Sequence, residues 1–298
     1  MGSNPTSSAD MKKYYTKYIL VLSLFVFLPL TVFAKLPESI SVFPEHIIQG
    51  EPIRISIESV ASLREIKNIK FNGKTLGVFM YKNYPTAIYG ADLNIKPGEY
   101  RITAELSGGT ILEKIITIEK REKIEAPLGI PEKLGGNTPQ SQTRLVNTLA
   151  EENKSLLGLR TGTKAFWTEK FRFPVSNPIV TDEYGYSRKT GEYSIAHKGA
   201  DFRAKEGTKV LAMNRGVVRL TREYRNYGKT VIVDHGLGLQ TFYMHLSKIN
   251  VNVGELVKPG QVIGLSGQTG YASEPHLHLT VRIDDISIDP IKFLELFK

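Results

Sequence analysis

The chain has no cysteine among its 298 residues, which excludes both disulfides and thiolate metal sites. Any metal ion must therefore be held by histidine, aspartate or glutamate side chains. No run of lysine and arginine interleaved with aromatic residues occurs, so the formal net charge of +9 does not indicate a nucleic acid partner. No HExxH sequence occurs either, which excludes the helical zinc-protease motif.

Long apolar segments are also scarce. The longest, residues 19–33, has about 15 residues and is shorter than the roughly 20 that a membrane-spanning helix needs. Lysines precede this run and the small residue Ala34 ends it, which is typical of an export signal. We therefore expect residues 1–34 to be a cleaved signal peptide, with 1–10 as an over-long start, and the mature chain to reach the periplasm or cell envelope of a bacterium. An uncleaved segment would instead anchor the chain to the membrane.

The remaining sequence divides into three regions that together predict a mainly β protein. Residues 36–121 contain short alternating strands and an Asn72-Gly73 hairpin signal, which predict a small Ig-like β-sandwich. Residues 122–172 combine a Pro- and Gly-rich linker with leucines spaced as on one helix face, which predicts a helical connector. Residues 173–298 return to strands punctuated by glycine and predict a second, antiparallel β domain.

Two histidines stand one residue apart in the segment HLHL of the C-terminal region. In a β-strand, His276, His278 and Thr280 would lie on one face, while Leu277 and Leu279 enter the core. A zinc ion binds a histidine nitrogen at about 2.1 Å, so one imidazole can be a ligand while its neighbour lies near a metal-bound water. The pair therefore predicts one ligand and one acid–base group.

The segment HKGADF supplies a second pair of candidate ligands. The central Gly199 and the lack of a helix pattern favour an extended or turning segment. Read as a strand, His197, Gly199 and Asp201 share one face and Phe202 packs inward. One aspartate oxygen and two histidine nitrogens around an open fourth position form the three-ligand arrangement of catalytic zinc.

A third segment, TFYMHL, adds another histidine. Strand alternation predicts that Thr241, Tyr243 and His245 share a polar face. Alone, His245 fits a structural role as well as a functional one, but the two preceding segments favour function. His235, before a Gly-Leu-Gly turn, is interpreted as a structural hydrogen-bonding residue.

The segments HKGADF, VIVDHGLGLQTFYMHLSKI, GELVKPGQVIGLSGQTG and SEPHLHLTVR, in this order, resemble the M23 peptidases, the lysostaphin or LytM-like family of zinc-dependent cell-wall endopeptidases. The resemblance covers the C-terminal region and not the N-terminal half. It implies that His197, Asp201 and His278 bind one zinc ion (Zn2+) per chain, and that His276 and His245 form the catalytic pair. It further implies hydrolysis of amide bonds in peptidoglycan peptide stems or cross-bridges by a zinc-activated water with histidine acid–base help.

The two catalytic histidines are expected to have different roles. We expect His276 to be the general base, and His245 to assist it or to hydrogen-bond the oxyanion. Family members also use a tyrosine near the first metal motif for the oxyanion. Tyr186 and Tyr193 both precede His197, and the sequence does not choose between them.

Two other hypotheses stay open. Some relatives have lost metal ligands and act as scaffolds or activators of other wall hydrolases, whereas this chain keeps all three ligands and both catalytic histidines. A regulated enzyme is the other alternative, in which the N-terminal sandwich or the connector covers the groove. The sandwich itself fits a spacer, a wall-binding module or a docking surface for an envelope protein partner, and its lone His46 is interpreted as a surface residue.

Overall fold

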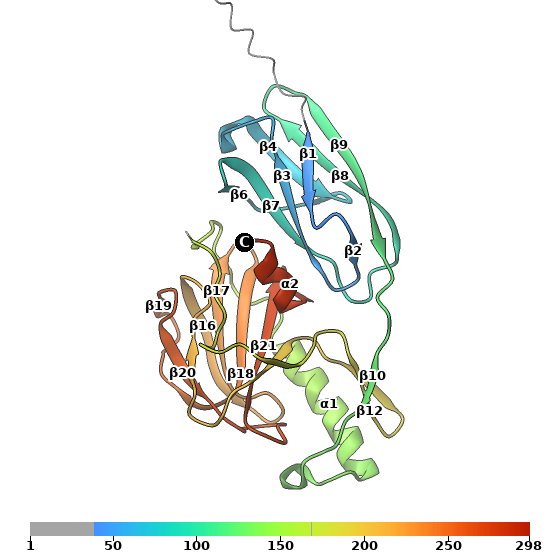
Figure 1. The fold of residues 1–298 in the computed structure, drawn as a ribbon, viewed down its shortest axis with the longest axis vertical. Coiled ribbons are helices and arrows are strands. Elements are labelled where there is room, and N and C mark those ends of the chain that lie inside the picture. The colour runs from blue at the N-terminus through green and yellow to red at the C-terminus, as the bar shows by residue number, and fades with distance from the viewer. Residues whose placement is uncertain (1–38, 168) are drawn as a thin grey trace, which may run out of the picture. The chain divides into compact units, whose positions relative to one another are not determined.

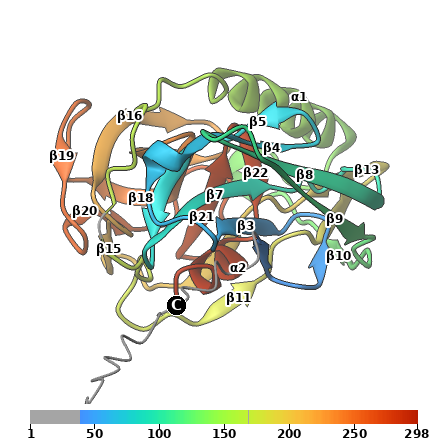
Figure 2. The ribbon, with the colours of Figure 1, turned by 90° about the horizontal axis from the view of Figure 1, so that it is seen from above.

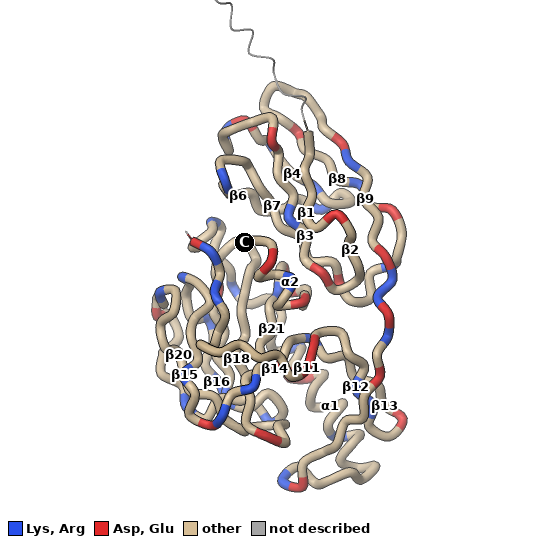
Figure 3. The backbone as a smooth tube through the Cα atoms, viewed as in Figure 1, with Lys and Arg blue, Asp and Glu red and all other residues tan. Residues whose placement is uncertain are grey.

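The computed structural model describes residues 39–167 and 169–298, so the predicted signal peptide lies outside the described residues. One compact unit starts at Leu36 and includes the rest of the chain. Strands dominate it, as the sequence predicts (Figure 1). Within 39–298, apart from residue 168, no helix combines the length and apolar character needed to cross a membrane. Basic and acidic residues are interspersed along the described chain (Figure 3).

Two sheets form the N-terminal part, and their inner faces share one hydrophobic cluster. In β3, Ile53, Ile55 and Ile57 are fully buried, so the predicted alternation is confirmed. Asn72 and Gly73 both have positive φ in the turn between β4 and β5, as a tight hairpin requires. The first sheet has the order β1 (Ile40–Phe43), β3 (Pro52–Ile57), β7 (Tyr84–Gly90), β6 (Val78–Tyr81), and the second has the order β2 (Ile47–Ile48), β9 (Ile111–Glu119), β8 (Gly98–Leu106), β4 (Ile66–Phe71), β5 (Lys74–Thr75).

The connector contains one strand and two helical elements: β10 (Glu125–Pro127), the 3-10 helix η2 (Glu132–Leu134) and α1 (Pro139–Ser155) (Figures 1 and 2). The Thr138 hydroxyl caps α1 by accepting a hydrogen bond from the Ser141 N–H, and Pro139 occupies the first turn. Leu156, which ends the helix, is fully buried with Phe242 and Met244 of the neighbouring sheet. This contact fixes α1 against the C-terminal domain.

A ten-stranded antiparallel sheet forms the C-terminal domain. Its central strands are buried over most of their length, which explains their largely apolar sequence. Along the main path the order is β11 (Val180–Asp182), β14 (Ala200–Arg203), β21 (His276–Ile283), β18 (Leu239–Ile249), β17 (Gly228–Gly236), β16 (Gly216–Tyr224), β19 (Leu256–Val257), with β15 (Lys209–Leu211), β20 (Val262–Ser266) and β22 (Ile286–Ile288) paired beside it. A small separate sheet joins β10 to the hairpin of β12 (Ser187–Thr190) and β13 (Tyr193–Ala196).

The N-terminal sheets and the C-terminal domain share part of one core. Phe79 of β6 stacks edge-on against Trp167, with ring centres 5.0 Å apart, and both belong to the cluster that contains Phe293 and Phe297. Those last two residues lie in and after the closing helix α2 (Pro290–Glu295), which starts with a proline.

Candidate metal centre

Two neighbouring strands and one turn bring the three predicted ligands together. Asp201 on β14 and His278 on β21 are direct partners in the antiparallel ladder. His197 approaches from the turn that precedes β14. His197 Nε2 lies 3.3 Å from Asp201 Oδ1 and 3.2 Å from His278 Nδ1, and the last two atoms are 2.7 Å apart.

This spacing fits one zinc ion. Two ligand atoms about 2.1 Å from a tetrahedral zinc lie roughly 3.4 Å apart, close to the two longer separations observed. The three side chains are only 10–15% exposed, and they offer two nitrogens and one oxygen. When bound, zinc supplies a Lewis acid that polarises a carbonyl and lowers the pKa of a coordinated water.

In each of the two candidate histidine ligands, a hydrogen bond from the ring nitrogen that points away from Asp201 fixes the tautomer. His197 Nδ1–H donates to the Glu183 carbonyl at 2.7 Å, which leaves Nε2 as a free lone pair. His278 Nε2–H donates to the Thr280 hydroxyl at 3.0 Å, and that hydroxyl donates to the Lys198 carbonyl at 3.0 Å. Such outer partners orient metal-binding imidazoles and raise their basicity. Both imidazoles are therefore preset to offer the nitrogen that faces Asp201.

The two remaining histidines are oriented in the same way. His276 Nδ1–H donates to the Glu274 carbonyl at 2.8 Å, and His245 Nδ1–H donates to the Thr269 carbonyl at 2.9 Å. Their ring centres are 4.8 Å apart, and His276 Nε2 lies 3.8 Å from Asp201 Oδ1. In each ring Nδ1 is thus engaged and Nε2 is left without a proton, as a proton acceptor requires.

The prediction that Thr241, Tyr243 and His245 share one polar face is wrong. Thr241 and Tyr243 are fully buried, and Tyr243 belongs to the main hydrophobic core. Between Tyr243 and Leu246, β18 has one residue more than β17, and His245 has a left-handed φ of +60°. This bulge turns the imidazole onto the face that carries His278, because an extra residue reverses the alternation. A left-handed backbone at a non-glycine residue is rare, and such residues cluster at functional sites.

Of the extended and turning alternatives for residues 197–199, the extended strand does not hold, because these residues form a bent connection between β13 and β14. A Cβ on Gly199 would lie 2.4 Å from His278 Nε2 and 2.5 Å from the Leu279 carbonyl oxygen. Glycine is therefore required for the close approach of the ligand ring. Phe202, in contrast, is fully buried, as predicted.

Burial and charge set the protonation states of the cluster. Burial raises the pKa of the Asp201 carboxyl, but the adjacent imidazoles of His197 and His278 outweigh it and hold that pKa well below its usual range. Burial lowers the pKa of His278, against the effect of Asp201. Burial, with the charges of the neighbouring imidazoles, lowers the pKa of His245 to about 3, so this ring is neutral at neutral pH.

Some residues considered from the sequence lie outside this cluster. The Tyr193 hydroxyl is 3.0 Å from the Thr143 hydroxyl of α1. Tyr186 contributes its backbone carbonyl, which accepts a hydrogen bond from the His197 N–H. His235 is fully buried, and its Nδ1–H donates to a backbone carbonyl at 2.8 Å, in agreement with a structural role.

Two parts of the chain adjoin the cluster, and we call them the two walls. The first wall is the β12–β13 hairpin, which ends directly before His197. The second wall consists of segments 225–228 and 267–273, in which Thr269 contacts His245 and Gly267 pairs with His276. The second wall also holds His245, whose N–H donates to the Tyr227 carbonyl at 3.0 Å. We name residues 125–134 the strap.

The strap contacts both walls. On the first wall, β10 pairs with β12 in parallel. On the second wall, Lys133 Nζ donates to the Gln268 carbonyl at 2.6 Å, and the Tyr271 hydroxyl donates to the Gly129 carbonyl at 2.6 Å. The connector therefore bridges the two sides of the metal cluster.

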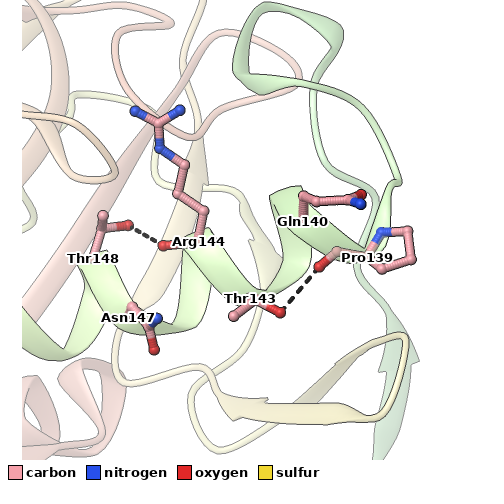
Figure 4. A pocket seen from close by; sticks show the side chains of 6 residues that line it. All are labelled: Pro139, Gln140, Thr143, Arg144, Asn147 and Thr148. Carbon is pink, nitrogen blue, oxygen red and sulfur yellow. Dashed lines mark hydrogen bonds between the residues drawn. The ribbon is translucent and has the colours of Figure 1, made fainter.

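Helix α1 makes a second bridge behind the strap. Besides the contact of Thr143 with the first wall, Thr148 accepts a hydrogen bond from Asn226 Nδ2 of the second wall at 2.7 Å. The Glu152 carboxylate accepts hydrogen bonds from the backbone N–H groups of Asn226 and Tyr227. A hollow of about 530 Å³ follows the N-terminal half of α1 (Figure 4), lined by Pro139, Gln140, Thr143, Arg144, Asn147 and Thr148.

Residues 195–290 match the family model described as Peptidase family M23. The peptidoglycan DD-endopeptidase ShyA of Vibrio cholerae is 42% identical over 96 residues, which cover 32% of this chain and 22% of that protein. Lysostaphin of Staphylococcus staphylolyticus is 40% identical over 125 residues, which cover 38% of this chain and 25% of that protein. The chain thus spans about a quarter or less of these relatives.

Among solved structures, a crystal structure from Pseudomonas aeruginosa named as a peptidase M23 is 25% identical. That likeness has a TM-score of 0.53 and covers 84% of this chain and 96% of the other, so it extends beyond the C-terminal domain. Together with the matched family model and the order of the metal motifs, it shows that the C-terminal domain of this chain belongs to peptidase family M23.

Proposed function

We propose that this chain is an exported, zinc-dependent endopeptidase that hydrolyses amide bonds in the peptide stems or cross-bridges of peptidoglycan. The observation that carries the proposal is the convergence of His197 Nε2, Asp201 Oδ1 and His278 Nδ1, with two further imidazoles, of His245 and His276, beside them. A structural zinc site would have four protein ligands, whereas three leave one position for water or substrate.

The remaining histidines supply proton transfer in this proposal. His276 accepts a proton at Nε2 from the attacking water and returns it to the amine as the C–N bond breaks. His245, neutral because of its low pKa, assists this transfer. Because its Nδ1–H is donated to the Thr269 carbonyl, it can hydrogen-bond the oxyanion only after its Nε2 has taken up a proton. Their carbonyl partners hold both rings in the tautomer that this role needs.

Two relatives support peptidoglycan as the substrate. ShyA and ShyB of Vibrio cholerae, which are 42% and 35% identical to this chain over the matched segments, are both named peptidoglycan DD-endopeptidases. The net charge of +9 also suits an anionic polymer of the cell envelope. These points support peptidoglycan as the substrate class. The bond that is cut would be identified by digesting defined muropeptides and measuring the masses of the products.

The direct experiment uses the mature chain, residues 35–298, on purified sacculi. We expect digestion in zinc-replete buffer, loss of digestion with a chelator, and recovery when zinc is added back. His278→Ala should abolish digestion, whereas His46→Ala, which removes an exposed histidine, should leave it unchanged. Digestion that persists through both the chelator and His278→Ala would rule out the metallopeptidase.

The alternative is an envelope scaffold or activator of other wall hydrolases that does not itself catalyse hydrolysis. The intact set of three candidate ligands favours the enzyme. One zinc ion per purified chain is expected for the enzyme, and a site that stays empty in zinc-replete buffer would favour the scaffold.

The strap favours a regulated form of this enzyme. It is the connector, through Gly129 and Lys133, that contacts the wall next to the candidate catalytic histidines. Both contacts are single hydrogen bonds near the surface, which are individually weak and can open without unfolding the domain. We propose that the strap limits access of the polymer to the metal cluster until it is displaced.

A further inference from the structure

A guanidinium lies between two carboxylates at the edge of the metal cluster. Arg188 on β12 forms an ion pair with Asp182 through Nη2, and the same nitrogen lies 4.0 Å from Asp201 Oδ2. Asp182 on β11 is the ladder partner of Asp201 on β14, so the two carboxylates are cross-strand neighbours. The three side chains are 20%, 17% and 15% exposed, which makes their mutual charges effective.

The two oxygens of Asp201 therefore have different surroundings. Oδ1 faces His197 Nε2 and His278 Nδ1, whereas Oδ2 faces Arg188. A carboxylate can bind a metal ion through one or both oxygens, and neighbouring carboxylates can add further ligands. Without Arg188, Oδ2 and the whole Asp182 carboxylate would be available within a few ångströms of the cluster.

We propose that Arg188 is a positioning residue that limits Asp201 to one metal-facing oxygen and keeps Asp182 off the metal. The site then keeps three protein ligands and an open position, the arrangement that suits zinc catalysis. Additional carboxylate oxygens would favour higher coordination and harder cations such as manganese. The inference deepens the proposed function, because it explains how an additional nearby carboxylate is excluded from the site.

Arginine suits this task better than lysine. Its planar fork can contact two carboxylates in a fixed geometry, whereas an ammonium is a point charge on a flexible stem. Arg188 Nε is buried without a hydrogen-bond partner among residues 39–167 and 169–298. The side chain is therefore held by its two carboxylate neighbours and not by a full set of hydrogen bonds.

The test compares metal coordination rather than activity. In the cobalt-loaded mature protein, Arg188→Gln should weaken the visible absorption, because cobalt of higher coordination number absorbs less than tetrahedral cobalt. The preference for zinc over manganese, measured by competition with a chelator, should fall by about tenfold to a hundredfold. The double variant Arg188→Gln/Asp182→Asn should recover much of both properties, since the competing carboxylate is gone.

Arg219→Gln is the matched control. Arg219 pairs with the buried Asp234 at 2.8 Å on β16 and β17 and is 23% exposed, close to Arg188. Loss of this pair should lower thermal stability and leave the cobalt spectrum and the zinc preference as in the parent.

A folded Arg188→Gln protein with the parent's cobalt spectrum and metal preference would overturn the proposal and leave Arg188 as a structural ion pair. Where Arg188→Gln fails to fold, Arg188→Lys replaces it in the same two assays. We then expect a smaller loss of cobalt absorption and of zinc preference, and an unchanged cobalt spectrum would overturn the proposal. The proposed function fails separately, if the parent binds cobalt as described but does not digest sacculi.

Discussion

Asp201 Oδ1 and His278 Nδ1 lie 2.7 Å apart because their residues are direct partners across β14 and β21. The metal cluster is thus fixed by the register of two neighbouring strands. A slip of β21 by one residue would turn His278 away from Asp201, to the face of the sheet where Leu277 and Leu279 are packed. Folding of the core and assembly of the candidate site are therefore one event.

Asp201→Asn tests the carboxylate in this relationship at nearly constant volume. The amide oxygen is a poorer zinc ligand and carries no charge, so we expect zinc affinity to fall by about a thousandfold and hydrolysis to be lost. Isothermal titration or chelator competition measures the first effect. Thermal unfolding of the zinc-free variant serves as the control, and zinc binding as tight as in the parent would refute Asp201 as a ligand.

Thr280→Val removes the hydroxyl that accepts the His278 Nε2–H bond. The side chain is nearly isosteric and 3% exposed, so the change acts on the orientation and tautomer of His278 and on the unpaired Lys198 carbonyl. Zinc affinity should fall by about tenfold to a hundredfold, as for other outer-shell partners. Thr280→Ser keeps the hydroxyl and should restore most of the affinity, and equal affinities for the two variants would show that the bond has no such role.

His276→Gln and His245→Gln separate metal binding from proton transfer. Neither residue is a candidate ligand, so both variants should keep one zinc per chain. Hydrolysis should fall by about a hundredfold to ten-thousandfold when the general base is lost. The larger loss identifies the base, which we expect to be His276. A variant that loses zinc in parallel with activity would instead be a ligand.

Much of this site could be predicted because strand alternation is a local property. The pattern of HLHL places His276 and His278 opposite buried leucines, and the structure confirms this arrangement. The position of His245 could not be predicted, because it depends on a bulge with a left-handed residue whose cause is the pairing of β18 with β17. The conformation of residues 197–199 could not be predicted either, because it depends on how the chain passes from β13 to β14.

The hydrogen-bond partners that set the histidine tautomers could not be predicted from the sequence either. Three are backbone carbonyls, of Glu183, Thr269 and Glu274, and a carbonyl carries no residue-specific signal. Thr280 could have been found, since it shares the strand face of His278 two residues away. The role of Arg188 could not be predicted either, because it depends on the cross-strand pairing of Asp182 with Asp201, which is known only from the tertiary structure.

A reversible disulfide tests the strap. Pro127 and Lys189 are exposed ladder partners of β10 and β12, and neighbouring strands lie about 4.8 Å apart, within disulfide range. Since the chain has no cysteine, Pro127→Cys/Lys189→Cys can form only this bond. The oxidised protein should digest sacculi several-fold more slowly than the same protein reduced with a phosphine, while the parent responds to neither treatment.

The opposite change should release the strap. Lys133→Ala removes the hydrogen bond to the Gln268 carbonyl and should raise the rate on sacculi, because it favours the open state. Lys120→Ala, an exposed lysine before the strap, is its matched control and should leave the rate unchanged. Equal rates for all these proteins would mean that the strap does not limit access.

The last prediction concerns stability and His235, which is remote from proton transfer in the proposed reaction. This fully buried imidazole donates from Nδ1 to the Arg215 carbonyl, and its Nε2 lies 2.9 Å from the Thr241 hydroxyl. Burial lowers its pKa from 6.5 to about 4. Between these values the unfolded chain binds a proton that the folded protein does not. The contribution of the His235 imidazole to the free energy of unfolding is therefore fully present above pH 6.5. It falls as the pH drops toward 4, by up to about 1.4 kcal/mol per pH unit.

His235→Gln should remove this component of the pH dependence, although it also lowers stability at pH 7 through the lost hydrogen bonds. The readout is the slope of unfolding free energy between pH 6.5 and 4, measured by denaturant titration in the presence of a chelator. His46→Gln, at an exposed position, should keep the parent's slope. The contribution of the other histidines is common to all three proteins and cancels in the comparison. If His235→Gln and the parent lose stability with the same slope, the imidazole of His235 is not held neutral by burial.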